Sequence, residues 1–189
     1  MKSEKEKMLT GELYLANGSE LTGERLFAKE LLYEFNNLKP AETEAGNAIL
    51  RKLFGNVHGN FYVEPPFRCD YGYNIEIGNN FYANYNLVIL DCASVKIGNN
   101  VLIAPNVSIY TAGHPIHTDV RNQHLEFALP IEIGDNVWIG GSVVINPGIK
   151  IGDNTVIGSG SVVTKDIPAN VIAFGNPCKV FRLITENDK

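Results

Sequence analysis

The chain has 189 residues, 44% of them hydrophobic and 20% charged, which is enough to bury the core of one globular domain. Its formal net charge of −5 argues against a nucleic-acid-binding protein, because such a surface needs clustered basic residues to neutralise phosphates. The charged start "MKSEKEKML" and the lack of an apolar run of about 18 residues predict neither a signal peptide nor a membrane span, so we expect a cytoplasmic protein.

Residues 1–56 have a helical pattern. Segment 21–40 ends at a proline and carries apolar residues at helical spacing, namely Phe27, Leu31, Phe35 and Leu38. Segment 42–54 places Ala45, Ile49 and Leu53 on one face before a glycine ends it. We therefore expect two amphipathic helices, with helices confined to this end of the chain and to its last few residues.

Residues 57–175 repeat with a period of six. An aliphatic residue recurs at Ile77, Ala83, Ile89, Ile97, Ile103, Ile109, Ile133, Ile139, Ile145, Ile151, Ile157 and Val163. Three hexads close one triangular coil, and stacked coils bury the aliphatic column, so the pattern predicts a mainly β fold, a parallel β-helix of hexapeptide repeats. An all-β sandwich is the alternative, but it predicts irregular turn spacing of about 8 to 12 residues. The glycines of the repeat, Gly78, Gly98, Gly134 and Gly152, are expected at corners whose backbone conformation a Cβ would penalise.

Two interruptions break the repeat. The step from Ile89 to Ile97 holds two extra residues, and the step from Ile109 to Ile133 spans 24 residues. The longer one, "TAGHPIHTDVRNQHLEFALP", lacks the aliphatic repeat, so we predict an excursion loop at about residues 110–132. Long loops in compact folds are uncommon and are usually functional.

Several stretches resemble one family: "RCDYGYNIEIGNNFYANYN", "IAPNVSIYTAGHP" and "IGDNVWIGGSVVINPGIKIGDNTVIGSGSVVTKDIP", with "MLTGELY" and "YEFNNLKP" near the start. The chain is similar to the maltose and galactoside O-acetyltransferases, sugar acetyltransferases of the hexapeptide-repeat superfamily. The resemblance implies a left-handed β-helix, followed by a C-terminal segment at 176–189. It also implies a homotrimer with active sites between subunits and acetyl-CoA as co-substrate, with no metal required.

His114 in "GHP" is the predicted general base, because a free histidine titrates near pH 6.5 and can accept and return a proton. The bland alternative is a loop histidine that hydrogen-bonds the surface. By resemblance, Asn84 in "YANYN" orients the acceptor hydroxyl and the base. The alternative for Asn84 is a corner asparagine with a left-handed backbone, as for Asn79, Asn80, Asn99 and Asn100.

The resemblance also assigns binding residues. Candidates for contact with the sugar are Asp70, Tyr82, Asp91 and Glu126, since carboxylates pair with sugar hydroxyls, although Asp91 and Glu126 fit equally well as solvated surface acids. The chain departs from the galactoside pattern by having Ala16 and Asn17 where an aspartate is expected. For acetyl-CoA, the Gly141 N–H is the expected oxyanion donor. Candidates along the pantetheine arm and the phosphates are Ser159, Thr164, Lys165, Lys179 and Arg182, with ordinary surface basicity the alternative, above all for Lys179. Trp138 either flanks the pantetheine arm or packs at the trimer interface.

Other functions remain open at this point. One is acetyl transfer to a non-sugar acceptor, such as an antibiotic or serine. Another is a β-helix carbonic anhydrase, which needs three converging histidines, and the chain has His58, His114, His117 and His124. A third is a catalytically silent scaffold. The cysteines Cys69, Cys92 and Cys178 form no C-x-x-C pair and predict neither a zinc site nor a disulfide framework.

Overall fold

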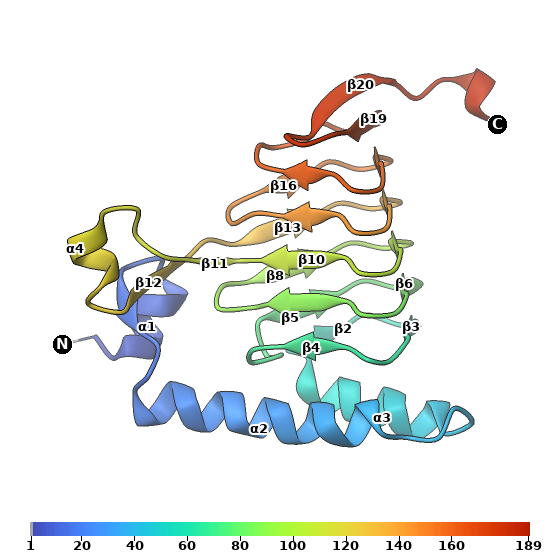
Figure 1. The fold of residues 1–189 in the computed structure, drawn as a ribbon. Helices are drawn as coiled ribbons and strands as arrows, with labels where there is room; N and C mark the ends of the chain where they lie inside the picture. Colours follow the sequence, from blue (N-terminus) through green and yellow to red (C-terminus); the bar gives the residue numbers. More distant parts are fainter. Residues whose placement is uncertain (1) are drawn as a thin grey trace.

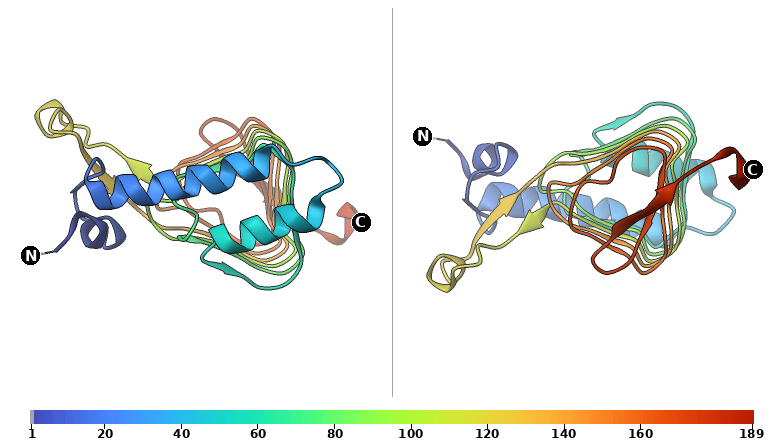
Figure 2. Two further views of the ribbon diagram at one scale, coloured as in Figure 1. Left: turned by 90° about the horizontal axis from the view of Figure 1, so that it is seen from below. Right: turned by 90° about the horizontal axis from the view of Figure 1, so that it is seen from above.

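The computed structural model describes residues 2–189 as a three-sided prism of stacked coils, a left-handed parallel β-helix with helices at its base (Figure 1). Seen along the axis, the coils superpose as a triangle (Figure 2). Each side of the prism is a parallel sheet that receives one strand from each coil. The triangular coil predicted from the hexads is confirmed.

The three sides differ in their outward residues. The charged face consists of β2 (Asn56–Val57), β5 (Ile75–Ile77), β8 (Val95–Ile97), β13 (Ile131–Ile133) and β16 (Lys150–Ile151). The aromatic face consists of β3 (Phe61–Val63), β6 (Phe81–Ala83), β9 (Leu102–Ile103), β14 (Trp138–Ile139), β17 (Val156–Ile157) and β19 (Val171–Phe174). The small-residue face consists of β4 (Arg68–Cys69), β7 (Val88–Leu90), β10 (Ser108–Tyr110), β15 (Val144–Ile145) and β18 (Val162–Val163).

The aliphatic residues of the hexads form the core. Register pairs like with like up each face, for example Ile97 with Ile133 on the charged face and Ile103 with Ile139 on the aromatic face. All twelve predicted positions are buried, with at most 3% of their surface exposed. Because each coil alone exposes its inward residues, stacking is what removes this apolar surface from water.

The corners correct one expectation. Asn80, Asn100, Asn136 and Asn154 take the left-handed conformation, with φ of 54–58°, whereas the repeat glycines do not. Asparagine tolerates this region because its short polar side chain bonds locally. The repeat glycines are needed for a different reason: a Cβ on Gly98 would lie 2.7 Å from the carbonyl carbon of Gly134 in the next coil.

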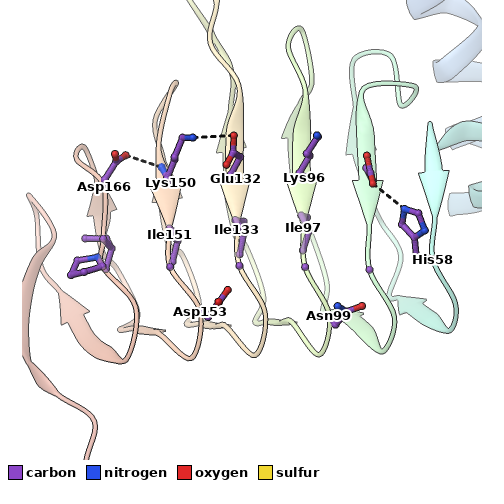
Figure 3. A pocket seen from close by; sticks show the side chains of 17 residues that line it. His58, Lys96, Ile97, Asn99, Glu132, Ile133, Lys150, Ile151, Asp153 and Asp166 are labelled. Carbon is purple, nitrogen blue, oxygen red and sulfur yellow. Dashed lines mark hydrogen bonds and ion pairs between the residues drawn. The ribbon is translucent and has the colours of Figure 1, made fainter.

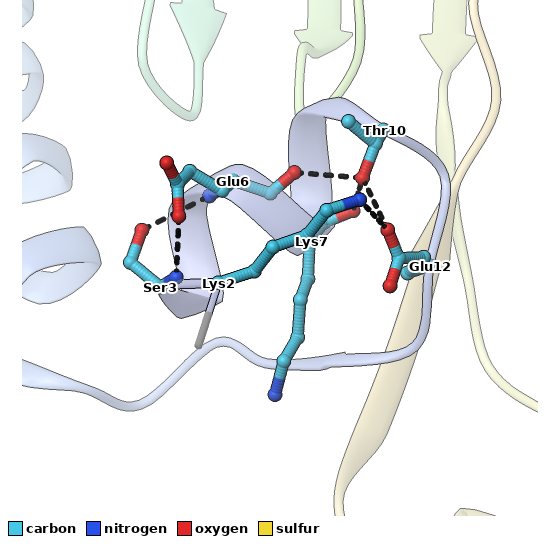
Figure 4. A network of polar contacts seen from close by, with 6 residues as sticks. All are labelled: Lys2, Ser3, Glu6, Lys7, Thr10 and Glu12. Atoms are coloured by element: carbon cyan, nitrogen blue, oxygen red, sulfur yellow. Dashed lines mark hydrogen bonds and ion pairs between the residues drawn. The ribbon is translucent and has the colours of Figure 1, made fainter.

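Helices cover the base of the prism. The two predicted helices are α2 (Ser19–Asn36) and α3 (Thr43–Leu53), and α3 packs Ile49, Leu50 and Leu53 into the core. A short helix that the sequence pattern did not reveal, α1 (Glu4–Leu9), precedes them. It begins with a capping box in which the Glu6 N–H donates to Ser3 Oγ and the Ser3 N–H donates to Glu6 Oε2 (Figure 4).

The predicted excursion is an ordered hairpin. It contains β11 (Ala112–Gly113), α4 (Thr118–Arg121) and β12 (Leu125–Ala128), so helices are not confined to the chain ends as expected. Strand β1 (Tyr14–Leu15) pairs with β12, and the resulting antiparallel sheet β1-β12-β11 stands outside the prism. α1, β1 and the excursion therefore form one substructure, on the left of Figure 1.

The last elements close the prism from above. Strand β20 (Lys179–Leu183) pairs antiparallel with β19, and the short 3₁₀ helix η1 (Glu186–Asp188) follows it. Cys69, Cys92 and Cys178 are buried and free. Within residues 2–189, no helix has the length and apolar character that a membrane crossing requires.

Candidate active site

A pocket of about 430 Å³ lies at the root of the excursion and brings together three of the predicted site residues. Asp70 follows β4, His114 follows β11, and Glu126 lies in β12. The remaining lining comes from Ala16, Arg25, Leu90, Cys92, Tyr110, Ala112 and Gly113. The pocket thus brings one imidazole together with two carboxylates. Asp70 is more than forty residues away from His114 and from Glu126 in the sequence.

His114 is exposed and is held by a backbone contact. Its Nδ1 lies 3.3 Å from the carbonyl oxygen of Leu125 in β12. A carbonyl only accepts hydrogen bonds, so Nδ1 carries the proton in the neutral ring and Nε2 keeps its lone pair. The ring therefore presents a proton acceptor to its surroundings.

The two pocket carboxylates have different settings. Glu126 accepts a hydrogen bond of 2.9 Å from the Tyr14 hydroxyl. Burial raises the pKa of Asp70, and the Cys92 thiol, 3.5 Å from Asp70 Oδ2, and the Arg25 guanidinium partly offset this rise. Both acids line the pocket, and Glu126 is half-buried and held by Tyr14, so their role as sugar contacts stays a prediction.

Asp91 requires a correction, because the structure does not place it against the pocket. Its side chain is fully buried, and Oδ1 accepts the backbone N–H groups of Asp70, at 3.0 Å, and Tyr71, at 2.9 Å. Burial raises the pKa of Asp91 to about 7. Neither a sugar contact nor a solvated surface position describes it. Asp91 instead fixes the backbone that carries Asp70.

Sequence reasoning missed Arg25, which lines the same pocket. Its guanidinium donates to the carbonyl oxygen of Ala16 and to the Tyr71 hydroxyl. Ala16, where the galactoside pattern has an aspartate, presents a methyl group to the pocket, and Asn17 is exposed outside the lining. Arg25 lies among other charged residues of a helix, so no local pattern distinguishes it.

A second group of predicted residues occupies a different corner, between the aromatic and small-residue faces. Asn84 and Gly140 occupy equivalent positions there, since each donates its N–H to the isoleucine carbonyl of the next coil. Gly141 follows Gly140, and its carbonyl accepts from the Gly160 N–H, while Ser159 lies against Gly140. Among residues 2–189, the Gly141 N–H donates no hydrogen bond. The left-handed asparagine at this corner is Asn86, with φ of 62°, so the corner explanation does not apply to Asn84.

Tyr82 and Trp138 lie on the aromatic face. Tyr82 stacks on Tyr62 with ring centroids 6.0 Å apart, and register continues this column through Leu102 to Trp138. Leu102 and Trp138 are about half exposed, at 50% and 53%. In one chain the aromatic face is thus an uncovered apolar surface, and Tyr82 is outside the pocket that holds His114.

The other residues predicted to bind acetyl-CoA lie nearer the C-terminal end of the prism. Thr164 and Lys165 follow β18 and are exposed, as is Lys179 at the start of β20. Arg182 makes two hydrogen bonds, of 2.6 and 2.7 Å, to the Asp188 carboxylate. Arg182 is thus paired with the C-terminal segment.

The charged face carries a larger and more open groove of about 860 Å³ (Figure 3). Its side chains pair with one another: His58 with Glu76 at 2.9 Å, and Lys150 with Glu132 at 3.2 Å. His58 is thus on a different side from His114, and no group of three or more His, Cys, Asp or Glu suited to a metal ion occurs within residues 2–189. The imidazole of this groove is thus paired with a carboxylate, whereas the ring of His114 contacts a backbone carbonyl.

Comparisons with known proteins agree with this geometry. The model of the maltose acetyltransferase hexapeptide capping motif matches residues 7–59, and that of the six-repeat bacterial transferase hexapeptide matches residues 130–165. A galactoside O-acetyltransferase of Escherichia coli is 51% identical over 184 residues, 97% of this chain and 91% of the relative.

Two solved structures are similar over nearly their full length. A maltose O-acetyltransferase from Clostridium difficile matches with a TM-score of 0.96 and 56% identity, over 98% of this chain and 99% of the other. A galactoside acetyltransferase in complex with coenzyme A matches with a TM-score of 0.96 and 49% identity, over 100% of this chain and 94% of the other.

Proposed function

Because the chain belongs to the family of maltose and galactoside O-acetyltransferases, we propose that it transfers the acetyl group of acetyl-CoA to a hydroxyl of maltose, glucose or a galactoside. The observation that carries this proposal is the excursion pocket, where an imidazole with a free Nε2 faces two carboxylates. A base beside groups that bind hydroxyls is what acetylation of a sugar requires.

His114 acts as the general base in this proposal. Its Nε2 accepts the proton of the acceptor hydroxyl and afterwards returns it to the thiol that leaves, while the Leu125 carbonyl keeps the other ring nitrogen protonated. Acetyl-CoA supplies the acetyl group in activated form as a thioester. The free Gly141 N–H is suited to hold the negative charge that develops on the acetyl oxygen, and as a backbone donor it works with any side chain at that position.

Asp70 and Glu126 bind the acceptor. Each carboxylate can take hydrogen bonds from two neighbouring hydroxyls of a pyranose, which fixes the sugar relative to His114. The methyl group of Ala16 removes a potential polar contact on the same wall. We therefore expect selection among sugars to rest on these two acids.

A homotrimer completes the site in our proposal. His114 and Asn84 flank opposite edges of the small-residue face, so one chain cannot place both beside one substrate. A cyclic arrangement sets the Asn84 corner of one copy against the His114 corner of the next. The uncovered aromatic face supplies an apolar contact surface, and Tyr82, Asn84 and Gly141 then approach the pocket from the neighbour.

In this proposal, the site between neighbouring copies also binds acetyl-CoA. Ser159 lies beside Gly141, and Thr164 and Lys165 stand at the far edge of the small-residue face. Lys165, Lys179 and Arg182 provide positive charge for the phosphates of the nucleotide. Arg182 must exchange Asp188 for a phosphate to take part.

The test is thiol release from acetyl-CoA in the presence of maltose, glucose, galactosides, a chloramphenicol-type drug and serine. We expect turnover with the sugars, and a loss of at least about a hundredfold for His114→Ala. His117→Ala, in the same excursion but at the cap of α4, is the matched control and should retain activity. Turnover confined to the drug or serine would redirect the proposal to a non-sugar acceptor.

A further inference from the structure

We propose that Tyr14 is a positioning residue for the reaction, which orients Glu126 directly and His114 through β12. This inference rests on the proposed function. The N-terminal segment would then contribute to acceptor binding as well as covering the base of the prism.

Strand pairing gives the first step of the argument. β1 is the outer strand of the sheet β1-β12-β11, and its register sets Tyr14 opposite Glu126 and Leu15 opposite Leu125. The other side of β12 pairs with β11, which leads into His114. β12 therefore lies between the N-terminal strand and the strand that carries the base.

The side chain of Tyr14 gives the second step. It is fully buried in a small cluster with Met8, Leu21, Tyr71 and Ala128. Its hydroxyl donates to Glu126 Oε2 at 2.9 Å, and burial raises the pKa of Tyr14 far above its ordinary value, so the hydroxyl stays protonated and remains a donor. Among residues 2–189, Tyr14 is the only residue that donates to this carboxylate.

The consequence for Glu126 is a fixed orientation. With Oε2 held by a buried phenol, the carboxylate is restricted to one orientation at the pocket that Glu126 lines. An acceptor hydroxyl then meets a preorganised partner, which lowers the entropic cost of binding.

The consequence for His114 follows from the backbone. The carbonyl that contacts His114 Nδ1 belongs to Leu125, the residue directly before Glu126 and directly opposite Leu15. A displacement of β12 would move the carboxylate and this carbonyl together. Tyr14 thus influences both acceptor binding and the orientation of the base, although it does not line the pocket.

The experiment compares Tyr14→Phe with Tyr73→Phe. Tyr73 is a matched control, because its hydroxyl also donates to a glutamate, Glu24, at 2.7 Å, but neither residue lines the acceptor pocket. For Tyr14→Phe we expect the KM for the sugar to rise about tenfold, the size of a lost hydrogen bond to a charged group, and kcat to fall severalfold. The KM for acetyl-CoA should stay within about twofold of wild type, since the pocket binds only the acceptor.

A double-mutant cycle with Glu126→Ala separates positioning from general stabilisation, because alanine removes the acceptor of the Tyr14 hydroxyl. If Tyr14 acts through Glu126, adding Tyr14→Phe to Glu126→Ala should raise the sugar KM by less than about threefold further. Equal kinetic effects of the two tyrosine variants, or fully multiplicative effects in the cycle, would overturn the inference. Should Tyr14→Phe fail to fold, Glu126→Ala decides, because an unchanged sugar KM in that variant contradicts any action through Glu126.

The inference and the proposed function fail in different ways. A wild-type protein that acetylates no sugar contradicts the proposed function. A wild-type protein that does so, with Tyr14→Phe altering only the thermal midpoint, contradicts the positioning role alone.

Discussion

Mixing two inactive variants tests whether each active site is shared between subunits. His114→Ala and Asn84→Ala each remove one partner from a site that, in our proposal, takes His114 from one copy and Asn84 from its neighbour. Each variant alone should be nearly inactive. Coexpressed in equal amounts with different tags, the two chains should form mixed trimers in which some sites regain both residues.

The expected recovery follows from the geometry. His114 and Asn84 stand at opposite edges of the small-residue face, so in the proposed trimer each site would draw on two copies. Half of the copies supply an intact histidine and half of the neighbours supply an intact asparagine, so about one quarter of the sites are complete in a cyclic assembly. The assay is thiol release by the purified mixed trimers, relative to wild type at the same chain concentration.

A second mixture provides the control. Equal amounts of wild type and the double variant should also give about one quarter of full activity when sites are shared, but about one half when each site lies within one chain. Recovery no greater than the sum of the two single variants, or a monomer by analytical ultracentrifugation, would refute the reasoning.

Three further predictions follow from individual residues. Burial raises the pKa of Asp91 to about 7, so the folded chain holds a proton that the unfolded chain loses above about pH 4; this contribution to stability falls as the pH rises towards 7 and is constant above it. The free energy of unfolding of Asp91→Asn, measured in denaturant titrations, should therefore increase relative to that of wild type by on the order of 3 kcal/mol between pH 5 and 8. The same pH dependence of stability in both proteins would contradict this prediction. Gly98→Ala should destabilise the chain by at least about 2 kcal/mol, because its Cβ would collide with the backbone of Gly134. The control Gly23→Ala lies in α2 with no atom near its Cβ and should stabilise the chain by about 0.5–1 kcal/mol. Equal thermal midpoints of the two variants would show that the spacing between coils relaxes. Lys165→Glu should raise the KM for acetyl-CoA and leave the sugar KM unchanged, and equal changes in both constants would count against a phosphate contact.

Some predictions from the sequence depended on partners that only the fold reveals. From the sequence, Asp91 and Glu126 could both be surface acids. In the structure, Asp91 is buried under the backbone of residues 70–71, and Glu126 accepts a hydrogen bond from Tyr14. The pairing of Tyr14 with Glu126 joins residues 112 positions apart, across two elements whose approach no local pattern encodes. The repeat glycines were located correctly but for the wrong reason, since the obstacle to a Cβ is the next coil and not the backbone angle.

The sequence by itself determined the prism. Burial of one aliphatic residue every six positions is a short-range pattern that recurs along the uninterrupted parts of the repeat, and its energetic consequence repeats coil after coil. Only the tertiary structure decided the site. His114, Asp70, Glu126 and Arg25 reach one pocket because the N-terminal strand folds back onto the excursion, and their chemistry depends on contacts between segments that are distant in the chain.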